Sequence, residues 1–377
     1  MVLSYQTPAL NTDTASELIT PALLVWPERI DSNITHMIRI ARDAGRLRPH
    51  CKTHKMIEVA QRLVAAGVSQ HKASTVVEVD MLCRAGASDV VLAGNPVGPS
   101  LTQLQEVVRR FPQTSIGVTA DAEGPIRQLS HESSASGCTL GVLLDLDVGL
   151  HRTGVPPDSA EAETLYSLVD SLPGIDPAGL HIYDGHHHQS NIDERTKAVR
   201  KAWQPVEDLV GRLESAGLPV PELLCGGTPS FPVYAEFEDA RIRLSPGTCT
   251  LHDVGYGRKC PDLVFEIAAA VATRVVSNAV PGQLTLDVGH KAIAADPPAG
   301  GRAILPDLPD AEAIIHNEEH LTVTTEHAAK YMPGDLLLAL PVHICPTVAL
   351  HEFAIVIENG VATDRWKIAR HRILRDA

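Results

Sequence analysis

The chain has 377 residues, which at roughly 100 to 200 residues per domain predicts about two domains. Its composition, 44% hydrophobic and 21% charged, is that of an ordinary globular protein and argues against a filamentous or disordered chain. The formal charge is -14 and no basic run is present, so a phosphate backbone would be repelled and nucleic acid is not expected as a partner.

The sequence shows neither the apolar run of a membrane-spanning helix nor the pattern of a secretory signal. The longest apolar runs, such as residues 267–272 and 336–340, are far shorter than the roughly 20 residues of a membrane-spanning helix. No Lys or Arg precedes Arg29, and Asp13 and Glu17 interrupt the N-terminal region, which therefore does not read as a secretory signal. The seven cysteines are odd in number and scattered, which predicts reduced thiols, one of them available as a metal ligand. We expect a cytoplasmic protein with no membrane partner.

From about residue 46 to 247, short β-branched runs alternate with helical patterns, as in repeated βα units with a parallel sheet. The expected helices are residues 55–66, 101–111, 160–172 and 194–216. Eight strands are predicted, at residues 46–51, 70–74, 89–93, 115–119, 139–146, 179–183, 222–225 and 241–245. Eight such units favour a closed (β/α)8 barrel over an open doubly wound sheet, and catalytic groups are then expected at the C-terminal ends of the strands.

After about residue 260 the pattern changes to short β runs without long helices between them. The runs are residues 263–276, 283–288, 320–325 and 353–357, and Pro-Gly turns occur at 281–282 and 333–334. This pattern predicts a smaller β domain, in which residues 296–301 form a surface loop.

The densest polar cluster at a predicted strand end is RPHCKTHK, residues 48–55. A lysine in the mouth of a barrel loses part of its hydration, which disfavours the ammonium form and suits an amine that reacts with a carbonyl. Lys52 and Lys55 could equally be solvated, and the spacing alone does not decide between these interpretations.

Two glycine-containing segments follow the seventh and eighth predicted strands, CGGTPSF at residues 225–231 and SPGT at 245–248. Taken singly, each is an ordinary turn. Because barrels often bind phosphate at these two strand ends, where glycines let backbone N–H groups approach an anion, the pair favours a ligand that carries phosphate.

Histidines and a cysteine form two further candidate clusters. In HICP, residues 343–346, an expected strand would place His343 and Cys345 on one face, where they could bind a metal ion and leave open positions for water and substrate. In HIYDGHHH, residues 181–188, we expect His186 or His187 to face the barrel mouth, with Asp184 able to orient one histidine. A buried thiol beside a packed histidine and exposed loop histidines are the alternative interpretations.

Together, RPHCKTHK, LDLDVGLHRTGV at residues 144–155, CGGTPSF, SPGT followed by Asp253, and HICPT resemble, in the same order, the D-threonine aldolase and D-serine dehydratase family of fold-type-III pyridoxal phosphate enzymes. The likeness runs from about Thr20 to near the C-terminus. It implies an alanine-racemase-like (β/α)8 barrel at residues 20–260 that binds pyridoxal phosphate, and a C-terminal β domain at 261–377 that carries the metal site. Residues 20–26 are expected to pair with the β domain.

The resemblance also assigns residues. The lysine that forms the imine with the cofactor falls on Lys52, with His50 beside it, and the arginine near the cofactor's phenolic oxygen falls on Arg152. The phosphate contacts fall on Gly226, Gly227, Thr228, Gly247 and Thr248, and the metal pair on His343 and Cys345. The histidine that aldolase relatives place after the sixth strand aligns here with Tyr183, and His186 to His188 follow it, so the general base is left open among Tyr183, His186 and His187.

The expected activity is that of a lyase on small D-3-hydroxy amino acids. A divalent ion at His343 and Cys345 could bind the substrate's β-hydroxyl and promote either retro-aldol cleavage of D-threonine or loss of the hydroxyl from D-serine or D-threo-3-hydroxyaspartate. Thiolate and imidazole ligands favour zinc and the dehydratase; harder ligands would suit manganese or magnesium. The GHHH and GHKAIAADP (289–297) segments resemble those of the aldolase members of the family, and this likeness makes D-threonine aldolase our first prediction.

Two readings from other classes remain open. A noncatalytic pyridoxal phosphate carrier would use the barrel alone, and the roughly 110 residues after the barrel argue against it. A racemase would need a second acid/base, for which Tyr256 and Tyr331 are the candidates, reaching across a dimer. The resemblance to the lyase family implies a homodimer.

Overall fold

The structure, a computed structural model, describes residues 8–374 and divides into two compact units. The barrel unit comprises residues 37–52, 57–247 and 371–374. The β unit comprises residues 8–36, 53–56 and 248–370. Each unit has its own sheet, and helix α2 (Pro27–Ala41) contains the first point at which the chain passes from one unit to the other.

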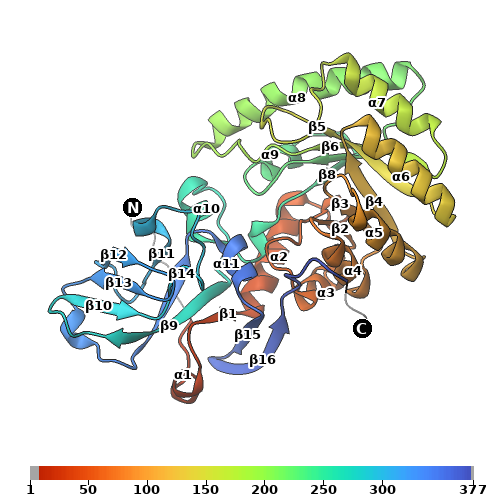
Figure 1. Ribbon diagram of the computed structural model, residues 1–377. Helices are drawn as coiled ribbons and strands as arrows, with labels where there is room; N and C mark the ends of the chain where they lie inside the picture. The colour runs from red at the N-terminus through yellow and green to blue at the C-terminus, as the bar shows by residue number, and fades with distance from the viewer. Residues whose placement is uncertain (1–7, 375–377) are drawn as a thin grey trace. The chain divides into compact units, whose positions relative to one another are not determined.

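The barrel unit is built on a seven-stranded parallel sheet whose strands follow one another in chain order. The strands are β2 (Gln70–Ala73), β3 (Asp89–Leu92), β4 (Ser115–Ala120), β5 (Leu140–Leu146), β6 (Ile175–Ile182), β7 (Leu223–Cys225) and β8 (Ile242–Leu244). The helices are α3 (Ile57–Ala65), α4 (Val76–Arg84), α5 (Pro99–Arg110), α6 (Glu123–Ser136), α7 (Ala160–Ser171), α8 (Ile192–Ser215) and α9 (Phe231–Ala235). Figure 1 shows α6, α7 and α8 on the outer side of the strands. The alternation of strands and helices is the one predicted.

The two edges of this sheet are joined by the segment that the sequence predicted as its first strand. Leu47 makes a parallel bridge to Leu244 of β8, and His50 makes one to Lys72 of β2. The segment is preceded by a 3-10 helix (Ala44–Arg46) and contains Pro49, which has no N–H to donate, so it forms isolated bridges rather than a regular strand. The prediction of eight regular strands was therefore wrong by one, but the ring closes as a barrel requires, which excludes the open doubly wound sheet.

The barrel interior holds apolar and polar side chains. Val91, Leu143 and Leu224, from β3, β5 and β7, pack together there, as side chains from alternate strands do in barrels of this type. In the strand register Lys72 lies opposite Val91, and Asp145 lies two residues beyond Leu143 in β5, so both belong to the same inner face. The polar interior positions are thus set by the same period-2 pattern as the core.

The β unit is built on a nine-stranded sheet. Its strands are β1 (Ala22–Val25), β9 (Ala269–Ser277), β10 (Gln283–Leu286), β11 (Ala303–Ile304), β12 (Glu312–His316), β13 (Leu321–Thr324), β14 (Leu336–Pro341), β15 (Phe353–Glu358) and β16 (Val361–Lys367). Its helices are α1 (Thr12–Glu17), α10 (Val254–Lys259) and α11 (Ile344–Leu350), with 3-10 turns at Thr248–Thr250, Ala299–Gly301 and Ala328–Lys330. Strand β1 pairs antiparallel with β9 and parallel with β15.

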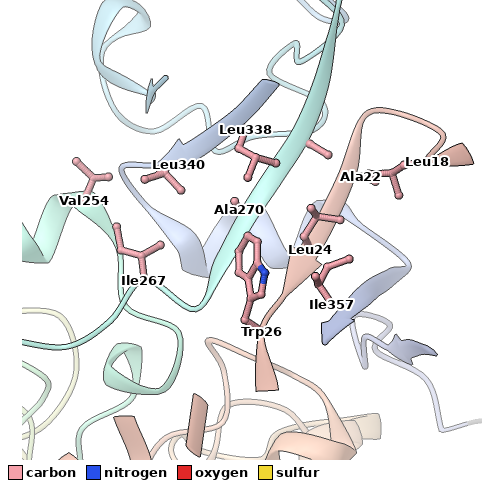
Figure 2. Close-up of a cluster of buried hydrophobic side chains, with 11 residues drawn as sticks. Leu18, Ala22, Leu24, Trp26, Val254, Ile267, Ala270, Leu338, Leu340 and Ile357 are labelled. Atoms are coloured by element: carbon pink, nitrogen blue, oxygen red, sulfur yellow. The ribbon is translucent and has the colours of Figure 1, made fainter. Parts of the chain in front are cut away.

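The core of the β unit lies where β1, β9 and β14 meet. Figure 2 shows the indole of Trp26 beside Leu24, with Ala270 of β9 and Leu340 of β14 in the same cluster. Each fully buried Leu or Ile contributes roughly 1.5 to 3 kcal/mol relative to an exposed side chain, so this cluster anchors the first strand of the chain to two strands in its last third. The early strand therefore belongs to the late sheet.

The helices and the cysteines of the described residues bear on two further expectations. None of the helices in residues 8–374 has both the length and the apolar character needed to cross a bilayer. All seven cysteines are free thiols, as their number and scatter predicted.

Candidate active site

Lys52 follows the segment that closes the barrel. Its backbone N–H donates to Nδ1 of His50 at 3.3 Å, and the N–H of His50 donates to the carbonyl of Pro246 at 2.8 Å, next to the SPGT segment. His50 is buried and Lys52 is half-buried. The sequence placed Lys52 and His50 at the cofactor; the structure puts them at the C-terminal end of the ring, where barrel enzymes hold their reactive groups.

Three cationic side chains surround one aromatic ring, that of Tyr183, which directly follows β6. Nζ of Lys52 and Nζ of Lys72 each lie 5.6 Å from the ring centroid, and Cζ of Arg152 lies 4.8 Å from it. These are cation–π distances. The structure therefore brings together Lys52, Arg152 and Tyr183, which the sequence singled out, and adds Lys72, which it did not.

Lys72 leads to a second buried group of polar residues that sequence reasoning missed. Its Nζ lies 3.3 Å from Nε2 of His181, whose Nδ1 lies 2.6 Å from a carboxylate oxygen of Asp145. Burial lowers the pKa of Lys72 to about 7, with Lys52 adding to the effect and Asp145 opposing it. Burial also lowers the pKa of His181, so imidazole is favoured over imidazolium, whereas the contacts with His181 keep the pKa of Asp145 low despite burial.

The loop after β7 passes close to Tyr183 and requires glycines. Gly226 has φ of +78°, and a Cβ on Gly227 would lie 3.2 Å from Cε2 of Tyr183. The N–H of Gly247 donates to Oγ1 of Thr228 at 3.2 Å, which ties the two predicted phosphate segments together. Ser245, in the second segment, has a buried Oγ with no hydrogen-bond partner among residues 8–374. The N–H groups of Gly226, Gly227 and Gly247 are bonded within the protein, so what fits a phosphate group here is the close approach that the glycines allow, the spare hydroxyl and the nearby cations.

Asp184 has a different role from the one expected. Its carboxylate accepts from Oγ of Ser230 at 2.5 Å and from the hydroxyl of Tyr234 at 3.1 Å, and Ser230 also accepts from the N–H of Gly227 at 3.1 Å. Burial raises the pKa of Asp184 to about 6, although the hydrogen bonds from Ser230 and Tyr234 act to lower it. The prediction that its side chain orients a histidine was wrong, because the described bonds direct it to the glycine loop instead.

His186 and His187 lie together in the loop after β6, with ring centroids 4.0 Å apart. Nε2 of His186 would lie 3.4 Å from a Cβ on Gly149, so this ring packs on the loop that carries Arg152. Burial lowers the pKa of His187 to about 4 and lowers that of His186, with neighbouring histidines adding to the effect. Nδ1 of His186 and Nε2 of His187 are buried and have no hydrogen-bond partner among the described residues, so the catalytic role of these histidines stays a prediction.

The predicted metal pair is in the β unit, but not in a strand. His343 is the N-cap of helix α11, and Cys345 lies in the first turn of that helix. The expectation of a strand was wrong, and Pro346 suits the first turn of the helix that forms instead. The two side chains still lie close together, since Cys345 is the main cause that raises the pKa of His343 to about 9, ahead of Asp296.

Three further residues contact this pair. Oδ2 of Asp296 lies 2.5 Å from Nδ1 of His343, as expected of a carboxylate that orients a ligating imidazole. Sγ of Cys345 lies 3.1 Å from Oγ1 of Thr53 and 3.5 Å from Oγ1 of Thr248. Thr53 directly follows Lys52 in the chain, and Thr248, predicted at the phosphate, directly follows Gly247. A soft thiolate and an imidazole suit a borderline-soft divalent ion such as zinc.

A second group, in the barrel unit, also has the composition of a metal site. Ligand atoms of His50, Cys51 and Glu78 lie within 4.8 Å of one another. However, the Glu78 carboxylate already accepts from the N–H of Ser74 at 2.6 Å, from its hydroxyl, and from the Cys51 thiol. This group therefore has a structural explanation in the turn between β2 and α4.

Comparison with known proteins agrees with the two-part organisation. A family model described as alanine racemase, N-terminal domain, matches residues 25–249, and one described as a putative serine dehydratase domain matches residues 268–357.

Individual relatives cover nearly the whole chain. It is 31% identical to a D-threonine aldolase of an Arthrobacter species, over 96% of this chain and 95% of that protein. It is 27% identical to a 3-hydroxy-D-aspartate aldolase of Paracoccus denitrificans, over 97% of this chain and 96% of that protein. The crystal structure of D-threonine aldolase from Filomicrobium marinum superimposes with a TM-score of 0.86 at 29% identity, and covers 97% of this chain and 98% of that one.

Proposed function

Since this chain belongs to the alanine racemase N-terminal domain family, and specifically to its pyridoxal phosphate-dependent lyases of D-hydroxy amino acids, we propose that it is a D-threonine aldolase. Such an enzyme splits D-threonine into glycine and acetaldehyde. The observation that carries the proposal is the 31% identity with the Arthrobacter D-threonine aldolase across 96% of the chain. The grouping of Lys52 and Arg152 around Tyr183 supports it.

The residues at the barrel mouth fit pyridoxal phosphate. Lys52 would bind the aldehyde, Arg152 would approach the phenolic oxygen, and the loops containing Gly227 and Gly247, together with Thr228, would receive the phosphate. When bound, the cofactor supplies an electron sink for the bond that breaks at Cα. Lys52 and Arg152 would supply positive charge for a dianionic phosphate and a substrate carboxylate.

We propose that His343 and Cys345 hold a divalent metal ion, with Asp296 fixing the imidazole. Such an ion provides Lewis acidity toward a hydroxyl of the substrate. The chain's contribution is to orient the ligands: Nδ1 of His343 faces Asp296, which leaves Nε2 available as the ligand atom. Zinc is the ion that the two ligands favour, with manganese or magnesium as the alternatives.

The second candidate is a dehydratase acting on D-serine or D-threo-3-hydroxyaspartate. The match of residues 268–357 to a serine dehydratase domain favours it, as does the thiolate ligand. In that reaction the β-hydroxyl leaves, and the product is a keto acid and ammonia instead of glycine and an aldehyde. Both activities would use Lys52 and His343, and they differ in their products.

The racemase reading has less support. Of its two candidate acids, Tyr331 donates its hydroxyl to the carbonyl of Asp307 at 3.3 Å, and Tyr256 lies in helix α10 with its N–H bonded to Asp253 at 2.8 Å. Racemisation should survive chelation, whereas the proposed lyase should lose most of its activity. The homodimer expected from the resemblance stays a prediction, which light scattering on the purified protein would test.

The proposed function is tested by product identity. Purified protein is incubated with D-threonine, D-serine and D-threo-3-hydroxyaspartate, with and without added zinc or manganese, and amino acids and keto acids are quantified. Glycine and acetaldehyde from D-threonine, in a metal-dependent reaction, is the expected result. A keto acid as the main product from D-serine or D-threo-3-hydroxyaspartate, without glycine from D-threonine, would replace the aldolase by the dehydratase.

A further inference from the structure

A buried lysine whose partner is an imidazole is costly to maintain. Lys72 is 1% exposed, and among the described residues it forms no ion pair closer than 4 Å. Its Nζ instead faces Nε2 of His181 at 3.3 Å, on the far side of the ring from Asp145. Burial of an ammonium without a carboxylate in contact is unfavourable, so a purely structural role would be better served by an apolar residue.

The hydrogen bonds determine how the protons are placed. Asp145 is an ionised acceptor, so Nδ1 of His181 carries a hydrogen and donates to it at 2.6 Å. In the neutral imidazole Nε2 is then the acceptor, and Lys72 donates to it. Transfer of one proton from Nζ of Lys72 to Nε2 of His181 leaves a neutral amine and an imidazolium held by Asp145, and it needs no other reactant.

The charges around this pair come from four parts of the barrel unit. Lys52 follows the closing segment, Asp145 belongs to β5, Arg152 belongs to the loop after β5, and Asp184 directly follows Tyr183 after β6. Lys52 and Arg152 disfavour the cationic form of Lys72, and Asp145 and Asp184 favour it. Burial is the largest cause and, together with these charges, lowers the pKa of Lys72 to about 7, so the pair in contact at 3.3 Å can gain or lose a proton close to neutrality.

We propose that Lys72 and His181 share one mobile proton and that this pair, fixed by Asp145, exchanges protons with the site at Lys52 and Tyr183. Lys72 is thus a positioning residue that acts through His181 and through the charge it places beside the Tyr183 ring. This inference rests on the proposed function. Aldolase relatives place a histidine where this chain has Tyr183, and the Lys72–His181 pair would supply the proton-transfer group in its stead.

The direct test uses protein without cofactor, labelled with ¹⁵N-histidine. The His181 signals, assigned with His181→Gln, should report a hydrogen on Nδ1 at pH 8 and a single titration step at lower pH. In Lys72→Met this step should vanish, while Lys201→Met, a change of an exposed lysine in α8, should leave it intact. A step that persists unchanged in Lys72→Met overturns the proposal. If Lys72→Met does not fold, Lys72→Arg keeps the charge but does not release its proton, so the step should vanish there too, and its persistence overturns the proposal equally.

A second readout uses the holoenzyme and separates this inference from the proposed function. Exchange of the glycine α-proton in deuterated water, followed by proton NMR between pH 6 and 9, requires no cleavage of a β-hydroxy amino acid. We expect Lys72→Met to slow exchange roughly 10- to 100-fold and to remove its pH dependence near 7. If the enzyme does not cleave D-threonine but its glycine exchange depends on Lys72, the aldolase is rejected and the proton pair is kept. Cleavage of D-threonine with an unchanged profile in Lys72→Met would keep the aldolase and reject the pair.

Discussion

Nζ of Lys72 lies 3.3 Å from Nε2 of His181, and both side chains are buried inside the barrel unit. The two residues come from β2 and β6, which are not neighbours in the sheet, so the contact crosses the barrel interior. An ionisable pair in this position links the charge of the site to the stability of the fold.

The first prediction concerns this link. Because the pKa of Lys72 is about 7 in the folded protein and near 10.5 in the unfolded chain, the unfolded chain binds the extra proton between these values. Stability due to this group therefore rises as pH increases from 7 to 10. Relative to Lys72→Met, the wild type should gain roughly 4 kcal/mol in free energy of unfolding over that range, measured by urea denaturation. For the control Lys201→Met, the difference in free energy of unfolding from the wild type should not change with pH. A difference that does not change with pH for Lys72→Met would contradict the pKa assigned to Lys72.

The second prediction concerns the loop after β7. Gly227→Ala adds a Cβ 3.2 Å from Cε2 of Tyr183, so either the ring or the loop must move by a few tenths of an ångström. Affinity for pyridoxal phosphate, measured by fluorescence titration of the unloaded protein, should fall roughly tenfold, equivalent to about 1.4 kcal/mol. Gly211→Ala is the matched control, since a Cβ there meets open space on helix α8. Unchanged affinity in Gly227→Ala would remove this loop from the cofactor site.

The third prediction concerns the metal ligands. His343→Ala should release the ion without reducing cofactor content, as measured by mass spectrometry of metals and by absorbance. His351→Gln is the control, because His351 ends the same helix and its Nε2 bonds the carbonyl of Ala292 at 2.8 Å, away from Cys345. One tightly held ion remaining in His343→Ala would show that the ligands lie elsewhere.

The fourth prediction concerns Asp296, whose carboxylate contacts Nδ1 of His343. Asp296→Asn keeps the size of the side chain but removes the charge that orients the ring and increases its basicity as a ligand. Metal affinity should fall by roughly 10- to 100-fold, measured by competition with a chromogenic chelator. Equal affinity in the variant and the wild type would mean that Asp296 plays no part in the metal site.

Much of the fold could be predicted from the sequence because the barrel's strands and helices show local patterns of apolar and β-branched residues. The closing segment could not be predicted as it is, since Pro49 and the bridges of Leu47 and His50 depend on the two edge strands that they join. A strand was expected at His343 to Pro346, where helix α11 begins; Pro346 was the signal available for a first helical turn.

Parts of the site were beyond sequence reasoning for a related reason. Lys52 and Arg152 stand in recognisable motifs, but Lys72 is 109 residues from His181, and His181 is 36 residues from Asp145. Nothing local connects these positions, and only the barrel register brings them to one inner face. Asp296 similarly lies 47 residues from His343 in a segment that read only as a surface loop.

The central claim is that the cofactor is held by Lys52, and borohydride reduction of the purified holoenzyme followed by peptide mass spectrometry tests it most directly. The account predicts a single phosphopyridoxyl group on Lys52, absent from Lys52→Ala along with the visible absorbance band. A modified Lys55 or Lys72 with Lys52 unmodified, or a retained band in Lys52→Ala, would contradict it.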